Sequence, residues 1–333
     1  MSNILSVWTY QLGKRIFNQI LPRLPTIWRI RLIYLRRQQQ WPNLSKPATF
    51  SEKIQWRKLY DRRKRLILFS DKLRVRRYVE HQLGPDVLLK LHWVSGDANR
   101  FDKNQLPDQF VLKVNHASNW GVQVVRDKSR FENSALRGLL KDWFSQRFGW
   151  LIGEWAYLYV KPKAYAEQLL QDASGQLPND YKFYIFHGKT QVVQVDQERG
   201  TDAYSISFYD ADWQYMDARW DVPNAKPIAA PKNFELMRSY AERLAAEMDF
   251  IRVDFYNLDG QIFFGEMAVY PGSGFDRFES KEMDQYLGSL WQLNPDEPLR
   301  STRSFGKRAA KIRAAAASGD TQARMDSLPP AAI

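Results

Sequence analysis

The stretch FIRVDFYNLDGQIFFGEMAVYPGSG, residues 250–274, decides the fold because it contains two candidate strands and the turn between them. Residues 251–256 and 261–267 alternate apolar and polar side chains, a pattern typical of half-buried strands. The four residues between them, NLDG at 257–260, are turn-forming types. The sequence therefore predicts an antiparallel hairpin.

The register of this hairpin decides which side chains share a face of the sheet. We predict a three-residue turn over residues 258–260, which places Arg252 opposite Glu266. Because side chains alternate with a period of two, Arg252, Asp254 and Glu266 then lie on one face. A two-residue Asp-Gly turn would slip the register and send Glu266 to the other face.

Two carboxylates and a guanidinium on one face suggest phosphate chemistry. Asp254 and Glu266 offer hard oxygen ligands to Mg²⁺, which takes its other ligands from water and phosphates. Arg252 would stabilise negative charge on a transferring phosphoryl group. A solvated face with an ordinary salt bridge is the alternative. The PGSG loop at 271–274 either approaches a ligand or simply turns the chain.

Several stretches, taken in chain order, resemble one known family. The pattern RVDF…GE…PGSG is similar to the carboxyl-terminal half of an ATP-grasp fold. The stretches TFSEKIQWRKLYD, SDKLRVRRYV, LPDQFVLKVNH, YKFY and PGSGF resemble its TupA-like branch, which is named for teichuronopeptide synthesis. The resemblance runs from about Pro47 to about Leu293. It implies an α/β (α+β) fold with a nucleotide cleft between two lobes.

The resemblance also implies which residues bind ATP. Lys72 and Lys113 match the two phosphate-binding lysines, and Lys113 ends a strand, where a buried charge needs a partner. Without the resemblance, Lys72 would be a solvated helix residue and Asp180 a turn residue. Residues 167–170 resemble the adenine hinge, Asp180 the ribose-binding acid, and Lys182 faces the same cleft. The implied nucleotide ligands are therefore Lys72, Lys113, Glu167, Gln168, Leu169, Leu170, Asp180 and Lys182.

Residues 115–121, NHASNWG, occupy the place of the loop that covers the phosphates in the family. Family members are usually richer in glycine there, and fewer glycines leave fewer N–H groups that can approach a phosphate closely. His116 and Ser118 can still donate hydrogen bonds, so with Arg252 and Lys113 they complete the implied catalytic set. A lone histidine is more often structural, and both interpretations of His116 stay open.

Ala268 departs from the family, which commonly has a metal-binding Asn two residues after the glutamate. Alanine cannot bind a metal, so either Asp254 and Glu266 hold one ion by themselves or a water fills the gap. On this ground an inactive protein of the same fold stays an alternative.

Composition bounds the class of protein. With 44% hydrophobic residues, 12 Trp, 16 Tyr and 19 Phe, the 333-residue chain is expected to be globular. The absence of cysteine excludes disulfides, thiolate metal sites and cysteine nucleophiles, and fits a cytoplasmic protein. A net charge of +12 would attract nucleic acid, anionic lipid or an acidic glycan. Nucleic acid ranks last because no zinc-finger or RNP motif is present.

The chain divides by composition into four parts. Residues 1–46 predict a basic amphipathic extension, which either contacts the inner face of the membrane or packs on its own domain. No apolar run approaches the ~20 residues that span a bilayer, and the start lacks a signal-peptide pattern. Residues 47–110 are expected to form an N-terminal domain and 111–295 a two-lobed ATP-grasp domain. Residues 296–333, rich in Ala, Arg, Ser and Pro, are predicted to be disordered.

Local patterns predict further elements. Thr49 and Glu52 make a capping box for a helix through Tyr60, and Ser70 or Asp71 opens a second helix through His81. Helices are also predicted over 133–148 and over 234–248, the latter with Asn233 as N-cap. Strands are predicted over 87–91, 110–114, 165–170, 182–186 and 191–195.

These features together predict an ATP-dependent carboxylate–amine ligase that uses ATP and Mg²⁺. The acceptor carboxylate would attack the γ-phosphate to give an acyl phosphate, and an amine would then displace phosphate. The resemblance implies an acidic surface polysaccharide as substrate, with an amine or amino acid joined to a uronic acid. The alternatives are a sugar or glycan kinase on the same fold and a non-catalytic glycan- or membrane-associated protein.

Overall fold

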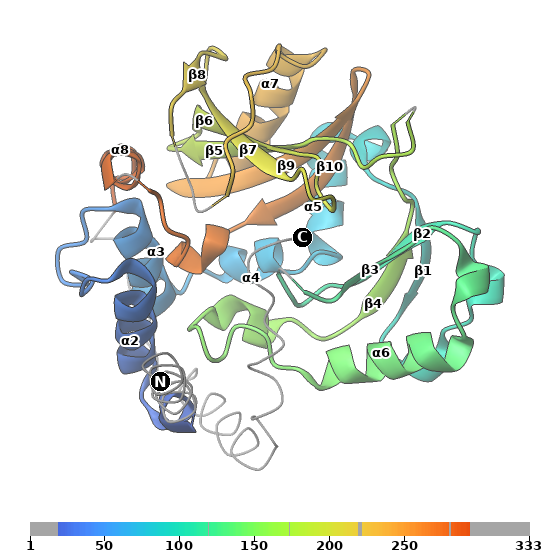
Figure 1. The fold of residues 1–333 in the computed structure, drawn as a ribbon. Helices are drawn as coiled ribbons and strands as arrows, with labels where there is room; N and C mark the ends of the chain where they lie inside the picture. Colours follow the sequence, from blue (N-terminus) through green and yellow to red (C-terminus); the bar gives the residue numbers. More distant parts are fainter. Residues whose placement is uncertain (1–18, 119, 173, 219–221, 280, 294–333) are drawn as a thin grey trace, which may run out of the picture.

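The computed structural model describes residues 19–118, 120–172, 174–218, 222–279 and 281–293, and its strands form two antiparallel sheets (Figure 1). The four-stranded sheet has the order β1-β4-β2-β3, and the six-stranded sheet has the order β10-β9-β5-β6-β7-β8. The fold is therefore α+β. The strands are β1 (Leu91–Ser95), β2 (Phe110–Val114), β3 (Val122–Val125), β4 (Ala164–Glu167), β5 (Asp180–Phe186), β6 (Lys189–Gln197), β7 (Ser205–Asp210), β8 (Tyr215–Met216), β9 (Phe250–Leu258) and β10 (Gln261–Ala268).

Helices cover both sheets (Figure 1). The described α-helices are α2 (Thr26–Gln38), α3 (Phe50–Tyr60), α4 (Lys64–Ser70), α5 (Arg74–Leu83), α6 (Asn133–Ser145), α7 (Phe234–Ala245) and α8 (Lys281–Leu290). Short 3-10 turns lie between them: η1 (Leu21–Arg23), η2 (Pro85–Val87), η3 (Ala98–Arg100), η4 (Lys103–Gln105), η5 (Lys128–Arg130), η6 (Trp155–Tyr159) and η7 (Pro271–Gly274).

The main core lies against the six-stranded sheet. The ring of Phe183 in β5 stacks on Phe234 of α7 at 6.1 Å between centroids, so α7 covers one face of the sheet. Phe50 at the start of α3 packs edge-on against Phe250 of β9 at 4.9 Å. Since α7 covers the apolar face, the opposite face is free to carry polar side chains.

The smaller core belongs to the four-stranded sheet. Leu112 of β2 and Leu140 of α6 are fully buried in it, so α6 covers the outer face of this sheet (Figure 1). Because side chains alternate, the other face of β2 and β4 carries Lys113, Tyr165 and Glu167. Each sheet therefore has one apolar face under a helix and an opposite face that carries charged side chains. On the six-stranded sheet this second face is apolar at one end, where Phe250 packs against Phe50 of α3.

Helix α2 packs on the domain that follows it. Ile30 and Tyr34 are buried, and Gln38 Nε2 donates a 2.8 Å hydrogen bond to the carbonyl of Asp276. The part of the extension that is described thus packs on its own protein. Residues 1–18 and 294–333 lie outside the described residues, as do the predictions made for them. The division between 47–110 and 111–295 stays a prediction.

The predicted turn of the 250–274 hairpin is wrong. Leu258 pairs with Gln261, so the turn has two residues, Asp259 and Gly260, both with positive φ (51° and 99°). Asp-Gly commonly forms a two-residue turn of this type, because the backbone twist of the turn matches the twist of the two strands. Asn233 stabilises the turn, since its Nδ2 donates to the carbonyl of Gly260 at 2.8 Å. Contrary to the prediction, Asn233 is left-handed and gives α7 no side-chain cap.

A β-bulge at Gly265 restores the expected face. Phe264 pairs with Phe255, but the next pair is Glu266 with Asp254, which leaves Gly265 as an extra residue. The slip that the two-residue turn introduces is thereby cancelled. Glu266 therefore shares the face of Asp254, as predicted. The prediction reached this face with a three-residue turn that paired Glu266 with Arg252, whereas the structure has a two-residue turn and a bulge.

The remaining element predictions had mixed outcomes. The capping box of Thr49 and Glu52 is confirmed. Asp71 precedes α5, whose N-cap is Leu73, and its Oδ1 accepts from the N–H groups of Leu73 and Arg74 at 3.1 Å. The strand predicted at 87–91 is wrong, because Pro85 begins a 3-10 turn and β1 starts only at Leu91. The strand predicted at 110–114 is confirmed with the same bounds, and the other predicted helices and strands occur with shifted ends. Among the described residues, no helix is long and apolar enough to cross a membrane.

Candidate functional site

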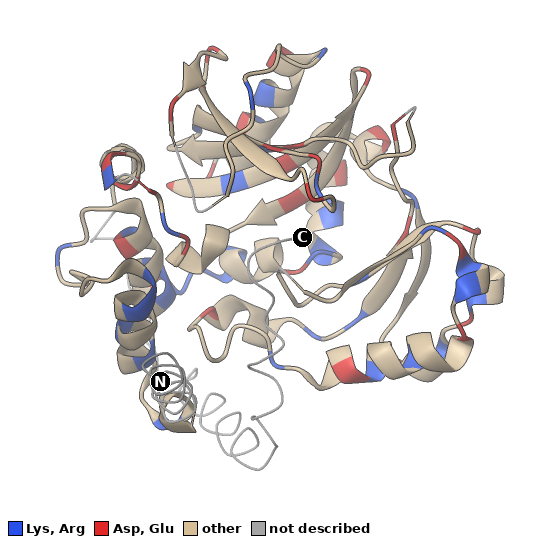
Figure 2. Cartoon of the chain, in the orientation of Figure 1, with Lys and Arg blue, Asp and Glu red and all other residues tan. Residues whose placement is uncertain are grey.

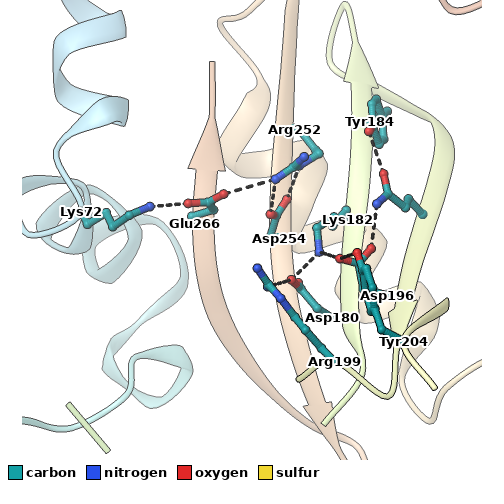
Figure 3. Close-up of polar contacts among 11 residues, drawn as sticks. Lys72, Asp180, Lys182, Tyr184, Asp196, Arg199, Tyr204, Arg252, Asp254 and Glu266 are labelled. Atoms are coloured by element: carbon teal, nitrogen blue, oxygen red, sulfur yellow. Dashed lines mark hydrogen bonds and ion pairs between the residues drawn. The ribbon is translucent and has the colours of Figure 1, made fainter. Parts of the chain in front are cut away.

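The hairpin face carries a tight cluster of charge (Figure 3). Arg252 binds Asp254 through two parallel hydrogen bonds, from Nε to Oδ1 at 2.7 Å and from Nη2 to Oδ2 at 2.6 Å. The same Nη2 donates to Glu266 Oε1 at 3.2 Å. Arg252 and Asp254 are buried, so each needs the other to offset the cost of losing water.

Lys72 joins this cluster from the loop between α4 and α5. Its Nζ contacts Glu266 Oε2, so both oxygens of Glu266 have a cationic partner (Figure 3). Asn115, at the end of β2, fixes this loop. Asn115 Nδ2 donates to Asp71 Oδ1 at 2.9 Å, and its carbonyl accepts from the N–H of Lys72 at 3.2 Å.

A second cluster follows along the same face, on β5 and β6. Lys182 contacts Asp180 and lies 2.8 Å from Asp196 Oδ2. Arg199 Nη1 lies 3.0 Å from Asp180 Oδ2, and the Tyr204 hydroxyl donates to Asp196 at 3.1 Å (Figure 3). Asp180 Oδ1 is buried and has no hydrogen-bond partner among the described residues.

The polar face of the small sheet contributes Lys113 and Glu167. Lys113 Nζ lies 2.5 Å from Glu167 Oε1, and Arg76 of α5 approaches Glu167 Oε2 at 3.9 Å. Burial raises the pKa of Tyr165 on this face, and the charges of Glu167 and Glu266 add to the effect. The polar faces of the two sheets therefore look toward each other.

The segment after β4 forms an apolar wall. Leu170 packs with Leu89 and Phe263 in a small cluster. The N–H of Gln168 donates to the carbonyl of Lys90 at 2.9 Å, so this amide is already engaged. Glu167 acts through its side chain, and the backbone of Gln168 and Leu169 continues from it along the wall.

The loop at 115–121 connects β2 and β3, and its residues 115–118 and 120–121 are described, whereas Asn119 lies outside the described residues. His116 is buried beside the backbone of Trp143 and Gln146 at the end of α6, and burial lowers the pKa of its imidazole. A neutral, enclosed imidazole favours the structural interpretation. Ser118 is half-buried and forms a side-chain hydrogen bond with Tyr157.

Opposite pKa shifts distinguish the two hairpin carboxylates. Burial raises the pKa of Asp254 to about 7, against the lowering effect of Arg252. Burial acts on Glu266 in the same direction, but Lys72 and Arg252 outweigh it and hold its pKa below the usual range. A divalent cation at this pair would lower the pKa of Asp254 as well.

The donor set was compared with what Mg²⁺ requires. The described residues contain no group of three His, Asp or Glu side chains arranged round one metal position. Ala268 lies opposite Arg252 in the register and offers no ligand there. Asp254 and Glu266 still provide hard oxygens on one face. Such a pair fits Mg²⁺ when phosphates and water complete the octahedron.

The charges fit a polyanion. The cations of the two faces lie in ion pairs with carboxylates of the same faces. The cations are Lys72, Arg76, Lys113, Lys182, Arg199 and Arg252, and the carboxylates are Glu167, Asp180, Asp196, Asp254 and Glu266. A phosphate chain could therefore take the place of these carboxylates as the partner of the cations, and each cation would stay paired.

Comparison with known sequences decides the family. The sequence model of the TupA-like ATPgrasp family matches residues 52–292, most of the chain. The chain belongs to the TupA-like ATPgrasp family. No curated protein matches it significantly.

Solved structures of ATP-grasp type are similar at low identity. D-alanine–D-alanine ligase from Bacillus anthracis complexed with ATP has a TM-score of 0.38 and 15% identity, covering 61% of this chain and 55% of that one. The Helicobacter pylori D-alanine–D-alanine ligase gives 0.37 and 17%, with 68% and 62% covered. N5-carboxyaminoimidazole ribonucleotide synthetase from Thermus thermophilus gives 0.38 and 15%, with 63% and 48% covered. The matched region thus spans less than two thirds of each of these proteins.

Sequence reasoning missed several members of these clusters. Asp196 and Arg199 were not singled out, because the predicted strand ends at 195. Extending the alternation by one residue would have placed Asp196 on the face of Gln194 and Lys182. Arg76 was not singled out either. Glu154 and Lys58 carried no local signal.

Proposed function

We propose that this protein is an ATP-dependent carboxylate–amine ligase. The observation that carries the proposal is the arrangement round Glu266, which contacts Lys72 on one side and Arg252 on the other. Arg252 also holds Asp254, and the face that carries Lys113 lies opposite. This arrangement offers a carboxylate pair for a metal between cations for a phosphate chain.

The roles of the residues follow from their charges. Lys72, Lys113 and Lys182 would neutralise the phosphates, and Asp180 Oδ1 would accept from a ribose hydroxyl. Asp254 and Glu266 would hold Mg²⁺, which supplies charge neutralisation at the transferring phosphoryl group. Arg252 would stabilise the acyl phosphate and the tetrahedral intermediate that the amine forms. Leu170, Leu89 and Phe263 would contact the adenine base. Little covalent help is required, because positioning and charge carry this type of transfer.

The substrate class is part of the proposal. An acidic polysaccharide whose uronic acid receives an amine or amino acid would suit a chain with a net charge of +12. The reaction joins two substrates, so the activity requires both a uronate and an amine.

A surface at the amino-terminal end supports work beside a membrane. The large apolar side chains that the described residues expose include Ile20, Trp28 and Trp41, which all fall within residues 19–41. This range carries five arginines, no acidic residue precedes Glu52 in the sequence, and Figure 2 shows the basic residues along α2. Exposed tryptophan with arginine is the composition of interfacial membrane contacts. We propose that this surface contacts anionic lipid.

One observation favours a second candidate. Both oxygens of Asp254 and both of Glu266 are engaged by cations of the chain itself, and Ala268 gives no further ligand. A protein that keeps the fold and binds a glycan without turnover would show the same pairs. The two candidates differ in whether ATP is consumed.

The test is ADP formation with MgATP, a uronate oligosaccharide and an amino-acid mixture, followed by detection of the amide. Glu266→Gln and Lys113→Ala should each reduce ADP formation by at least ~100-fold. Lys189→Ala, at an exposed lysine remote from the cluster, is the matched control. Variants as fast as wild type would reject the site. A stable phosphorylated sugar formed without amine would select the kinase.

A further inference from the structure

A buried carboxylate and a buried ammonium lie on either side of one serine. Glu154 is 2% exposed and Lys58, in α3, is 1% exposed. Both approach Ser273 in η7, the turn that follows β10. The roles described above use neither residue.

The backbone of this turn is held in an unfavourable conformation. Gly272, Ser273 and Gly274 have φ of 53°, 54° and 59°, three successive left-handed residues. Two of them are glycines, for which this conformation is easy, whereas at a residue with a Cβ it costs about 1–2 kcal/mol. Strain of this kind persists where the surroundings impose it, and it concentrates at functional sites.

Contacts from α3 impose the conformation. Lys58 Nζ donates to the carbonyl of Ser273 at 2.5 Å and to Gln55 Oε1 at 3.0 Å. Gln55 Nε2 donates to the carbonyls of Ser273 at 3.0 Å and Gly274 at 2.7 Å. Lys58 also lies 4.1 Å from the centroid of the Phe275 ring. The ammonium thus positions the serine.

The serine side chain leads from the surface to the carboxylate. Its Oγ donates to Glu154 Oε1, and Ser273 is half-buried whereas Glu154 is buried. Of the two residues, Ser273 is therefore the more accessible to a molecule approaching from outside. This is the order of groups in a proton relay.

The relay lies beside the proposed phosphate site. Glu266 is near enough for its charge to contribute to the raised pKa of Glu154, after the larger effect of burial. The pKa of Tyr157 responds to both carboxylates, and Tyr157 forms a hydrogen bond with Ser118. Ser273 follows Glu266 by seven positions along β10 and η7, so one segment carries both groups.

We propose that Glu154, acting through the hydroxyl of Ser273, accepts the proton that the incoming amine loses. The inference rests on the ligase function proposed above. An N–H proton of the ammonium passes to Ser273 Oγ as the hydroxyl proton passes to Glu154. The free amine then forms the C–N bond, the acyl C–O bond to phosphate breaks, and the phosphate leaves with that electron pair and takes up the second N–H proton. Ser273 contacts the substrate, and Glu154 and Lys58 act through it.

The surroundings of Glu154 suit this role. Several polar and titratable groups face Glu154. They are Lys58 of α3, Tyr157 of η6, Glu266 of β10, Tyr270, Ser273 of η7, and Asp276, which follows η7. Burial raises the pKa of Glu154 to about 7, with Lys58 and Ser273 acting in the opposite direction. A carboxylate with its pKa near the working pH transfers protons most effectively.

The test separates the two half-reactions. Full-length protein is given MgATP and a uronate oligosaccharide, with either an amino-acid mixture or hydroxylamine, which is already unprotonated near neutral pH. Glu154→Gln and Ser273→Gly should reduce amide formation with amino acids by at least ~100-fold. In the hydroxylamine assay, ADP formation and hydroxamate formation should stay within about twofold of wild type, because hydroxylamine has no proton to lose before it attacks.

Two variants keep the test decisive. Ser273→Gly removes the hydroxyl while giving a left-handed position the residue that prefers it, so the fold should survive. Glu282→Gln, at an exposed residue of α8, is the matched control. In wild type the rate of amide formation should rise as the pH passes through the raised pKa of Glu154, about 7, and this rise should be absent in Glu154→Gln.

Two outcomes count against the inference, and they are distinguishable. If both variants form amide at the wild-type rate and with the wild-type pH dependence, the relay does not exist although the ligase does. If wild type forms neither ADP nor hydroxamate with any uronate, the ligase function itself fails and the inference fails with it.

Discussion

Asn115 and Asp71 are joined by a 2.9 Å hydrogen bond from Nδ2 to Oδ1, which ties the end of β2 to the loop that carries Lys72. Asn115 Nδ2 also donates to the carbonyl of Lys161 at 3.1 Å, and Oδ1 accepts from the N–H of Lys163 at 2.8 Å. One buried amide therefore fixes Lys72 relative to Lys113, two residues before it in β2. The distance between the two proposed phosphate-binding lysines depends on it.

Replacing Asn115 by Ala should destabilise the protein and weaken ATP binding together. Asp71, Lys161 and Lys163 would each lose a hydrogen bond to Asn115, and a buried polar group left without a partner costs about 1–3 kcal/mol. Urea unfolding measures the first effect, and the KM for ATP, expected to rise more than kcat falls, measures the second. Asn99→Ala, at an exposed asparagine, is the control. Unchanged stability would show that Asn115 does not organise the loop.

Gly265→Ala should destabilise the hairpin and reduce activity. A Cβ at this bulge would lie 3.0 Å from the carbonyl oxygen of Asp254 and 3.5 Å from its Cβ, so Asp254 would have to move. We expect a loss of about 1–3 kcal/mol in the free energy of unfolding. Gly138→Ala in α6, measured in the same way, should instead raise the free energy of unfolding. Nothing lies within 4 Å of its added Cβ, and alanine favours a helix by about 0.5–1 kcal/mol. Equal effects at the two glycines would contradict the role of the bulge.

Asp249 should contribute stability that depends on pH. It accepts from Arg57 Nη2 at 2.7 Å, Arg63 Nη2 at 2.8 Å and Trp291 Nε1 at 2.8 Å. Burial opposes its ionisation, but the two arginines outweigh burial and lower the pKa of Asp249 from 3.8 to about 2. A depressed carboxyl pKa gives stability that is complete above about 3.8 and is lost as the pH falls toward 2.

The variant that tests this is Asp249→Asn. It should lose at least about 2 kcal/mol of unfolding free energy at neutral pH. The difference from wild type should stay constant down to the unfolded-state pKa and shrink below it, as urea titrations at several pH values would measure. Asp86→Asn, at an exposed aspartate, should show no such trend. A difference that grows on acidification would reverse the sign and reject the explanation.

Trp28→Ser and Trp41→Ser should weaken binding to anionic vesicles. The full-length protein should sediment with phosphatidylglycerol vesicles and much less with phosphatidylcholine vesicles at the same salt concentration. Each substitution should reduce the bound fraction severalfold. Leu236→Ser, at another exposed apolar residue, should leave it unchanged. If all three variants bind as wild type does, or if an acidic glycan competes as the better ligand, the lipid-contact proposal is wrong.

Local signals predicted local structure well. The capping box of Thr49 and Glu52 involves residues three positions apart, and it occurs as predicted. The turn of the hairpin was predicted wrongly because the local sequence is compatible with both a three-residue Leu-Asp-Gly turn and a two-residue Asp-Gly turn. The bulge at Gly265 then cancelled the error, since the burial of Phe255 and Phe264 on one face fixes the pairing more strongly than the turn does.

The parts of the site that were missed depend on distant partners. Glu154 has a raised pKa because it is buried, and its hydrogen-bond partner Ser273 lies 119 positions away in the sequence. Nothing in the residues next to Glu154 indicates that burial. The segment predicted as a strand at 87–91 also has a distant partner, because Arg76 donates to the carbonyl of Leu89. Contacts between segments that are remote in sequence leave no periodic pattern.

The contact between Lys72 and Glu266 gives the ligand-free protein a competitor of its own. Glu266 is paired with the Lys72 ammonium, which a phosphate oxygen would need as its partner. Lys72 in turn is paired with a Glu266 oxygen that a metal cation would need as a ligand. A triphosphate without its metal, or a metal without its triphosphate, would break this pair and leave one half unmatched. Under the proposed function, the pair would separate without electrostatic loss only when both arrive together. The contact between the two side chains would then select for the complete metal–nucleotide complex.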